Sequence, residues 1–302
     1  MMTTKITSNQ LKQRQALSLD LKEMLSANRI RQWYEHWAGM VYVSFSGGKD
    51  STVLLDLVRK QYPEIPAVFV NTGQEYAEII RFVKSVDNVI WLKPKFTFWQ
   101  VVEKYGWPVV SKETSQKIYE ARTTKSAKLL HKRLHGDNNK YKSGKIPNKW
   151  QYLIDAPFKI SHRCCHWLKI EPIHRFEKQS GLRSFVGLMA VNSQARKQKY
   201  LKQGCNAYDN KKKTSIPLAF WKESDIWDYV TTEKLPYSEI YNQGEKNTGC
   251  KYCMYGCHLD KINKFQRMRK RTPGQFENLR RHGGCEVLDA LKVNYEEPKL
   301  LF

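Results

Sequence analysis

One short run of residues combines the groups that a phosphate-binding loop needs: Ser46-Gly47-Gly48-Lys49-Asp50-Ser51-Thr52. The adjacent glycines allow positive φ and a close approach to a ligand, so successive N–H groups can point at one anion. Lys49 adds positive charge, the hydroxyls add neutral donors, and Asp50 is suited to hold a magnesium ion beside phosphates. No glycine stands at position 43, so this is not the Walker pattern. The glycines also fit an ordinary corner between a strand and a helix.

The flanking residues place this run between two regular elements. A β-branched apolar stretch, Val41 to Phe45, precedes it, and apolar residues at helical spacing follow from Val53 to Val58. In this setting the run resembles the pyrophosphate loop of the adenine nucleotide alpha hydrolase superfamily, which includes phosphoadenosine phosphosulfate (PAPS) reductases and N-type ATP pyrophosphatases. The resemblance implies that ATP, PAPS or adenosine phosphosulfate (APS) places its phosphates on Ser46 to Thr52.

A second and a third unit of the same kind follow along the chain. Ala67 to Val70 reads as a buried strand, and Asn88 to Leu92 begins the next unit. This alternation predicts an α/β fold with a doubly wound parallel sheet, whose ligands bind at the carboxyl ends of the strands. In the PAPS reductase family a Thr-Gly after the second strand lies near the nucleotide. Thr72 and Gly73 match it, although Asn71 replaces the usual aspartate.

The segment after the predicted strand Ser184 to Leu188 departs from the family. Related enzymes show Gly-x-Arg-x-x-Glu-Ser-x-x-Arg, and here Met189 and Asn192 stand in place of the first arginine and the glutamate. Ser193 and Arg196 remain, so the resemblance assigns Arg196 to the nucleotide. The loss of the first arginine weakens the expectation that a sulfated nucleotide is read in the usual way.

Two cysteine pairs form a second candidate site: Cys164 with Cys165, and Cys250 with Cys253 in a Cys-x-x-Cys. Four thiolates of this kind are typical of zinc or iron-sulfur ligation. Their order after the Ser-Gly-Gly-Lys-Asp-Ser run resembles the APS reductase branch, which implies a [4Fe-4S] cluster on these four residues, with zinc as the alternative. Three further residues are spare candidates, for which inert burial is the simpler prediction: Cys205, Cys257 and His258.

The end of the chain lacks a feature of sulfonucleotide reductases. Those enzymes end in a mobile Glu-Cys-Gly-x-His segment that carries the nucleophilic cysteine. The only late cysteine here is Cys285, followed by apolar residues that place it at the start of a helix. A helix N-terminus would lower the pKa of the thiol, which leaves a catalytic role for Cys285 open.

Composition points to an anionic partner. The 302 residues include 52 Lys and Arg against 29 Asp and Glu, a net charge of +23, which favours nucleic acid or phosphorylated molecules, with membrane surfaces as the rival. No apolar run approaches the ~20 residues of a membrane span, and the first thirty residues are too polar for a secretory signal. We therefore expect a cytoplasmic protein whose seven cysteines serve metal or redox chemistry.

The predicted organisation has three parts. Residues 1–40 form an N-terminal helical segment, 41–235 form the nucleotide-binding domain with a basic insertion at about 111–160, and 236–302 form a Cys-rich segment that completes the metal site. The insertion is either a solvated, partly helical element or a nucleic-acid arm, with aromatic residues for stacking on bases: Tyr119, Tyr141, Trp150 and Tyr152. Its cations are Lys112, Lys117, Arg122, Lys125, Lys128, Lys132, Arg133, Lys140, Lys142, Lys145 and Lys149.

Three functions are consistent with these features. The first is an ATP pyrophosphatase that activates or transfers sulfur in nucleic-acid modification, with Lys49 and Asp50 as catalytic groups and a sulfur-donor partner. The second is a sulfonucleotide reductase that makes sulfite through a cysteine, Cys285, resolved by a thioredoxin-like partner. The third is a non-catalytic nucleic-acid-binding module that senses a nucleotide.

Overall fold

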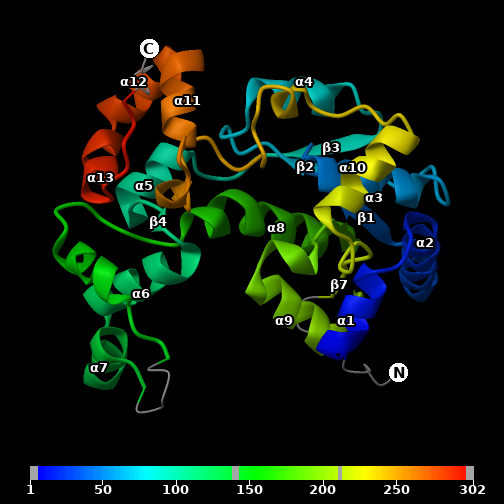
Figure 1. The fold of residues 1–302 in the computed structure, drawn as a ribbon, viewed down its shortest axis with the longest axis horizontal. Coiled ribbons are helices and arrows are strands. Elements are labelled where there is room, and N and C mark those ends of the chain that lie inside the picture. Colours follow the sequence, from blue (N-terminus) through cyan, green and yellow to red (C-terminus); the bar gives the residue numbers. More distant parts are fainter. Residues whose placement is uncertain (1–5, 138–142, 210–212, 297–302) are drawn as a thin grey trace. The chain divides into compact units, whose positions relative to one another are not determined.

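The computed structural model describes residues 6–137, 143–209 and 213–296 (Figure 1). The chain forms two compact units. The first comprises Met1–Asn71, Glu75–Lys93 and Pro172–Thr248, and the second comprises Thr72–Gln74, Pro94–Glu171 and Gly249–Phe302. The basic insertion predicted at about 111–160 thus belongs to the same unit as the residues after 248.

A six-stranded sheet organises the first unit, in the order β3-β2-β1-β5-β7-β6. Its strands are β1 (Val41–Ser44), β2 (Ala67–Val70), β3 (Val89–Leu92), β5 (Arg183–Val186), β6 (Asn206–Ala207) and β7 (Thr214–Ser215). All neighbours are parallel except β6 and β7. The predicted α/β fold with a mostly parallel sheet is therefore confirmed. The order reverses between β1 and β5, the point at which such sheets bind ligands beyond the strand ends.

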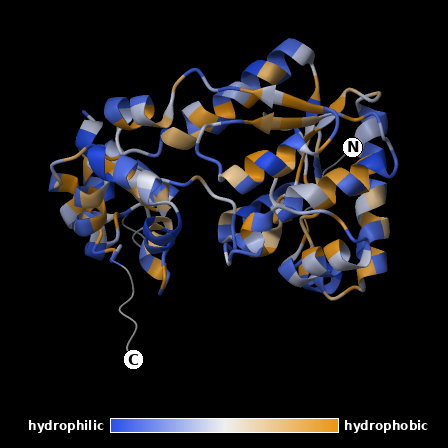
Figure 2. Ribbon diagram, turned by 90° about the horizontal axis from the view of Figure 1, so that it is seen from above, coloured by the Kyte–Doolittle hydropathy of each residue, from blue (hydrophilic) through white to orange (hydrophobic). Residues whose placement is uncertain are grey.

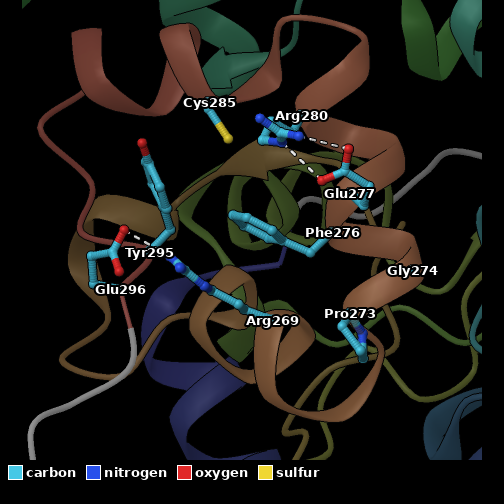
Figure 3. Close-up of a pocket in the computed structure, with 9 residues that line it drawn as sticks. All are labelled: Arg269, Pro273, Gly274, Phe276, Glu277, Arg280, Cys285, Tyr295 and Glu296. Atoms are coloured by element: carbon cyan, nitrogen blue, oxygen red, sulfur yellow. Dashed lines mark hydrogen bonds and ion pairs between the residues drawn. The ribbon is translucent and has the colours of Figure 1, made fainter.

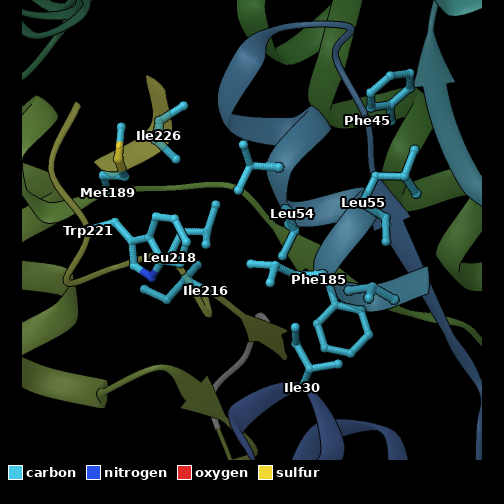
Figure 4. Close-up of a cluster of buried hydrophobic side chains, with 14 of the residues drawn as sticks. Ile30, Phe45, Leu54, Leu55, Phe185, Met189, Ile216, Leu218, Trp221 and Ile226 are labelled. Carbon is cyan, nitrogen blue, oxygen red and sulfur yellow. The ribbon is translucent and has the colours of Figure 1, made fainter. Parts of the chain in front are cut away.

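Helices surround this sheet. They are α1 (Ser8–Gln15), α2 (Leu19–His36), α3 (Lys49–Arg59), α4 (Ala77–Lys84), α8 (Glu171–Ser180), α9 (Gln194–Gln203) and α10 (Glu223–Thr232). Helix α3 contacts β1, β5, α2 and α10, and its apolar side chains enter the buried cluster that contains Ile30, Leu54 and Phe185 (Figure 4). A buried ion pair of 2.7 Å between Lys22 Nζ and Asp225 Oδ2 joins α2 to α10.

The second unit is mainly helical. Its helices are α5 (Phe98–Tyr105), α6 (Lys112–Thr123), α7 (Ala127–His135), α11 (Lys264–Arg271), α12 (Pro273–Arg281) and α13 (Gly284–Ala290). A short parallel pair, β4 (Val109–Val110) with β8 (Met254–Tyr255), joins the start of the insertion to the residues after Cys253. Arg122 in α6 donates to four backbone carbonyls, those of Leu153, Ile154, Ala156 and Phe158, and so fixes the end of the insertion.

Apolar residues concentrate in the strands, which are largely orange in the hydropathy view of Figure 2. Side chains of Val43, Ala67 and Phe185 are fully or almost fully buried, as expected for strands that are covered on both faces. In the part of the chain that the structure describes, no helix combines the length and the apolar character needed to cross a bilayer.

Candidate nucleotide and cysteine sites

The loop between β1 and α3 is held in shape by its own hydroxyl groups. Ser51 Oγ accepts a hydrogen bond from the Ser46 N–H at 3.1 Å and donates to the Gly48 carbonyl at 2.8 Å. Thr52 Oγ1 donates to the same carbonyl at 3.1 Å. Side chains within the first turn of α3 therefore fix the backbone of the loop that precedes it, which explains why serine and threonine stand at these positions.

Both glycines of the loop lie where a side chain would meet its neighbours. Gly47 has φ +70°, and a Cβ atom there would lie 2.7 Å from Val83 Cγ2 and 2.9 Å from Ile79 Cγ2. A Cβ atom on Gly48 would lie 2.7 Å from Thr248 Oγ1. Gly48 is also the N-cap of α3, so the amides that follow it are those at the positive end of the helix.

Lys49 carries a buried charge in this loop. Its residue is 5% exposed, and its Nζ lies 3.1 Å from Asp50 Oδ1 and 3.4 Å from Glu223 Oε1. Burial alone would lower the pKa of Lys49, but Asp50, Tyr241 and Glu223 together outweigh burial and hold the pKa above its ordinary value. The ammonium group is therefore charged at neutral pH, as a phosphate ligand needs to be.

A cavity of about 250 Å³ opens on this loop. It lies at the carboxyl ends of β1 and β5. Gly187, directly after β5, allows the chain to pass close to the start of α3, since a Cβ atom there would lie 3.0 Å from the Asp50 carbonyl oxygen. The lining residues are Ser44, Ser46, Gly48, Lys49, Asp50, Ser51, Val186, Gly187, Leu188, Arg196, Tyr241, Asn247 and Thr248. Polar groups thus converge at the switch point of the sheet.

The four candidate ligand cysteines all lie in the second unit and interact electrostatically. Cys164 is hydrogen-bonded to Cys165 and also feels the charges of Cys250 and Cys253. A π-helical turn, His166–Ile170, follows Cys165, and β8 begins directly after Cys253. Such turns are frequent at functional sites. Electrostatic interaction therefore links the two pairs, which are separated by 85 residues of sequence.

Cations surround these thiols. The Cys164 hydrogen bond lowers the pKa of Cys165, and Lys169 and Lys112 lower it further, so Cys165 ionises before its neighbour. Burial raises the pKa of Cys253, against the opposing charge of Lys264, whose Nζ donates to the Cys250 carbonyl at 3.0 Å. Among the residues described, no three His, Cys, Asp or Glu side chains form a group that could hold a metal ion. The choice between zinc and an iron-sulfur cluster stays a prediction.

Comparison with known families decides the affiliation of the chain. Residues 40–255 match the phosphoadenosine phosphosulfate reductase domain family. The chain belongs to this family. The match spans the loop, the cysteine pairs and the strands described above, and it confirms the resemblance to the PAPS reductase family and its adenine nucleotide alpha hydrolase superfamily.

Individual relatives differ in length and description. An uncharacterized protein of Methanocaldococcus jannaschii, MJ0066, is 26% identical over 274 residues, which are 87% of this chain and 46% of that protein. A second from that organism, MJ0973, is 23% identical over 92% of this chain and 55% of its own length, so the chain spans about half of each. An adenosine 5'-phosphosulfate reductase of Lysinibacillus sphaericus is 25% identical over 75% of this chain and 79% of that enzyme. The PAPS reductase structure from Candida auris shares 16% identity, with a TM-score of 0.44 over 82% of this chain and 98% of that one.

Of the other residues that the family pattern predicts to bind the nucleotide, only some line the cavity. Arg196 lines it, from a helix whose first turn is capped by Ser193 Oγ, which accepts from the Arg196 N–H at 3.2 Å. Thr72 and Gly73 belong to the second unit and are not among the described residues that line the cavity. Tyr241 and Thr248, which were not predicted as site residues, do line it.

Met189, which replaces the first arginine of the family pattern, is a core residue. Its side chain is 1% exposed and belongs to the cluster that includes Trp221 and Ile226 (Figure 4). It does not line the cavity. The position that carries a cation in related enzymes therefore contributes apolar packing here.

Cys285 differs from the expectation based on its helix. It lies in α13 and faces a second cavity of about 650 Å³ with Arg269, Phe276, Arg280 and Tyr295 (Figure 3). Burial raises the pKa of Cys285, and the carboxylates of Glu286 and Asp289 raise it further. The predicted lowering of the pKa by the helix N-terminus is therefore wrong, because burial and two nearby acidic groups outweigh a helix of seven residues.

Several cations of the basic insertion form ion pairs or hydrogen bonds within the insertion. Lys117 pairs with Glu113 at 2.6 Å, and Arg133 pairs with Glu120. Trp150 is 7% exposed and belongs to the core, so its predicted availability for base stacking is wrong. Tyr119 lies 5.7 Å from the Arg163 guanidinium, and Tyr152 is exposed. Tyr141, Lys140 and Lys142 lie outside the described residues.

Proposed function

We propose that this chain is a nucleotide-dependent enzyme that binds ATP on the Ser46–Thr52 loop and acts as an ATP pyrophosphatase in sulfur transfer to nucleic acid. The observation that carries the proposal is the buried, charged Lys49 in a glycine loop at the switch point of the sheet. Asp50 and Glu223 keep this ammonium group charged before a ligand binds, so it is ready to attract phosphate oxygens. A triphosphate would supply those oxygens together with a leaving group.

The reaction follows from this placement. An acceptor oxygen attacks the α-phosphorus, the bond to the bridging oxygen breaks, and pyrophosphate leaves with the electron pair. Lys49 and the amides at the start of α3 are oriented before the reaction, so they stabilise the charge that develops on the phosphate oxygens. Arg196 also lines the cavity, so its guanidinium group is suited to bind a second phosphate. Asp50 would hold a magnesium ion, which commonly uses one or two carboxylates and substrate phosphates.

A [4Fe-4S] cluster is inferred from the thiol chemistry of the four cysteines and from the resemblance to the APS reductase branch, although the described side chains do not form a ready-made metal-binding group. Cys164, Cys165, Cys250 and Cys253 would hold it, and the cations of Lys169, Lys112 and Lys264 would offset the negative charge of the thiolates. A bound cluster supplies electron transfer or a site for sulfur. Zinc on the same thiolates is the alternative.

Nucleic acid is the proposed acceptor because of charge. The net charge of +23 favours a polyanion. Within the insertion, Lys125 just before α7 and Lys128 in its first turn are exposed. Lys117 and Arg122 are instead hydrogen-bonded to backbone carbonyls. We expect the exposed lysines to contact phosphates and the bonded ones to maintain the fold of the insertion. A sulfur-donor protein would complete the reaction.

A sulfonucleotide reductase is the second candidate, since relatives that this chain covers over most of their length are named adenosine 5'-phosphosulfate or phosphoadenosine 5'-phosphosulfate reductases. Two observations weigh against it. Met189 is buried where the family has an arginine, and burial and acidic neighbours raise the pKa of Cys285, which disfavours the thiolate that would attack sulfur. A thioredoxin-like partner would be needed only in this case.

One experiment separates these candidates. The full chain, purified without oxygen, is incubated with ATP, PAPS or APS, with and without DNA or RNA, while pyrophosphate and sulfite are measured. The proposal expects pyrophosphate from ATP, at a rate that nucleic acid raises. Sulfite from PAPS or APS in the absence of nucleic acid would reject it in favour of the reductase. Tight nucleotide binding without any product would instead indicate a sensor module.

A further inference from the structure

The first amide of α3 already has a partner in the structure. The Lys49 N–H donates to Tyr241 Oη at 2.8 Å, and the Lys49 ammonium lies 5.8 Å from the centre of the Tyr241 ring. The Tyr241 hydroxyl is also hydrogen-bonded to the side chain of Thr248. Lys49 is the first residue of α3, so this N–H is one of the amides that a helix cannot satisfy internally and that bind phosphates in such loops.

Tyr241 reaches this amide from a distant part of the sequence. It ends the short helix Glu239–Tyr241, and its ring packs edge-on against Trp227, with ring centres 5.4 Å apart. Tyr241 and Thr248 both line the cavity on the loop. With them in place the cavity holds about 250 Å³, less than the ~300–1,000 Å³ of typical small-molecule sites.

We propose that the Tyr241 hydroxyl occupies the position of a phosphate oxygen on the Lys49 amide, so that phosphate binding requires its displacement. The proposal rests on the function proposed above and adds a residue that sets nucleotide affinity. The same amide cannot make a full hydrogen bond to Tyr241 and to a phosphate oxygen at once. Loss of the hydroxyl therefore removes a competitor while the ring keeps its packing against Trp227.

The test compares two conservative variants of the full chain by calorimetric titration with inorganic pyrophosphate and, separately, with ATP. Tyr241→Phe is expected to bind pyrophosphate about 2- to 10-fold more tightly than the wild type, the factor that corresponds to one neutral hydrogen bond. Tyr237→Phe is the control, since Tyr237 also packs against Trp227 but bonds to Asn242 and is not a lining residue. This variant is expected to match the wild type.

The change in pyrophosphate affinity distinguishes two roles of the Tyr241 hydroxyl. A hydroxyl that competes with phosphate and one that supports phosphate binding predict changes in opposite directions. Unchanged or weaker binding by Tyr241→Phe would overturn the proposal, because it would mean that the hydroxyl supports the loop or contacts the phosphate itself. If the wild type binds pyrophosphate and ATP but the variant gains nothing, only this inference fails. If neither protein binds either probe, the phosphate site of the proposed function fails as well.

A crystal of the wild type soaked in pyrophosphate gives an independent measurement. We expect a phosphate oxygen within hydrogen-bonding distance of the Lys49 nitrogen and the Tyr241 hydroxyl beyond it. Pyrophosphate bound on the loop with the Tyr241–Lys49 hydrogen bond intact would contradict the proposal directly.

Discussion

The phosphate loop and the cysteine site differ in how far apart their residues lie in the sequence. In the first unit, one continuous run supplies the loop, its shaping hydroxyls and its charge, since Ser51 and Thr52 hold the backbone of Gly48 within the same turn. In the second unit, the two cysteine pairs lie 85 residues apart in sequence but belong to one compact unit. The first site is local in origin, and the second depends on tertiary structure.

The two sites should therefore respond differently to substitution. The loop contains a charge that is already compensated by Asp50 and Glu223, so the unit can fold around it without a ligand. The hydrogen bond to Cys165, burial and the neighbouring cysteines all raise the pKa of Cys164, so the four thiols do not all ionise without a metal ion to bind them. We therefore expect substitutions in the first site to change function and those in the second to change the content of bound metal.

The largest expected effect concerns the core beneath the loop. Met189→Arg would bury an unpaired cation at a position that is 1% exposed and is expected to destabilise the protein by about 3–5 kcal/mol. The free energy of unfolding from urea titration measures this. Met189→Leu, which conserves volume, is expected to cost less than about 1.5 kcal/mol. Wild-type stability of the arginine variant would show that the side chain can leave the core and reach the cavity.

The second-largest effect is expected for a substitution in the phosphate loop. Lys49→Met removes the buried ammonium and is expected to lower the rate of pyrophosphate release by about 100- to 1,000-fold, the usual cost of one oriented group that stabilises developing charge. Lys60→Met is the matched control, because Lys60 ends the same helix region and pairs with Asp56 and Glu233 outside the cavity. A loss below tenfold for Lys49→Met would mean that its charge serves only the fold.

A smaller effect is expected at the cysteine site. Cys253→Ser is expected to weaken metal retention by at least about 10- to 100-fold, since even groups that only support a ligand have effects of this size. Iron, zinc and acid-labile sulfide per chain, measured after anaerobic purification, test this. The same replacement at Cys285, in the same unit, is expected to leave the metal content unchanged. Equal losses in both variants would argue for general unfolding instead of a lost ligand.

The sequence predicted the parts of the molecule that depend on neighbouring residues. The strand, loop and helix at 41–58 and the parallel sheet follow from apolar spacing and paired glycines, which act locally. Tyr241 was not predicted as a site residue because its hydroxyl meets an amide 192 positions away. Charge and aromatic composition also could not separate Trp150, which is buried, from Tyr152, which is exposed, since burial depends on tertiary packing.

The wrong prediction for the pKa of Cys285 also arose because burial depends on tertiary packing. The smallest expected effect concerns the reactivity of this thiol. A helix start favours the thiolate, but burial, Glu286 and Asp289 favour the protonated thiol and raise its pKa. A raised pKa means a smaller thiolate fraction at pH 7, so alkylation of Cys285 by iodoacetamide should be a few-fold slower in the folded protein than in urea. Its rate should keep rising with pH beyond the ordinary thiol value of about 8.5. Mass spectrometry of the peptide that contains Cys285 measures both rates in one sample. Faster labelling of the folded protein at pH 7 would reveal an activated thiolate, and it would strengthen the sulfonucleotide reductase at the expense of the pyrophosphatase.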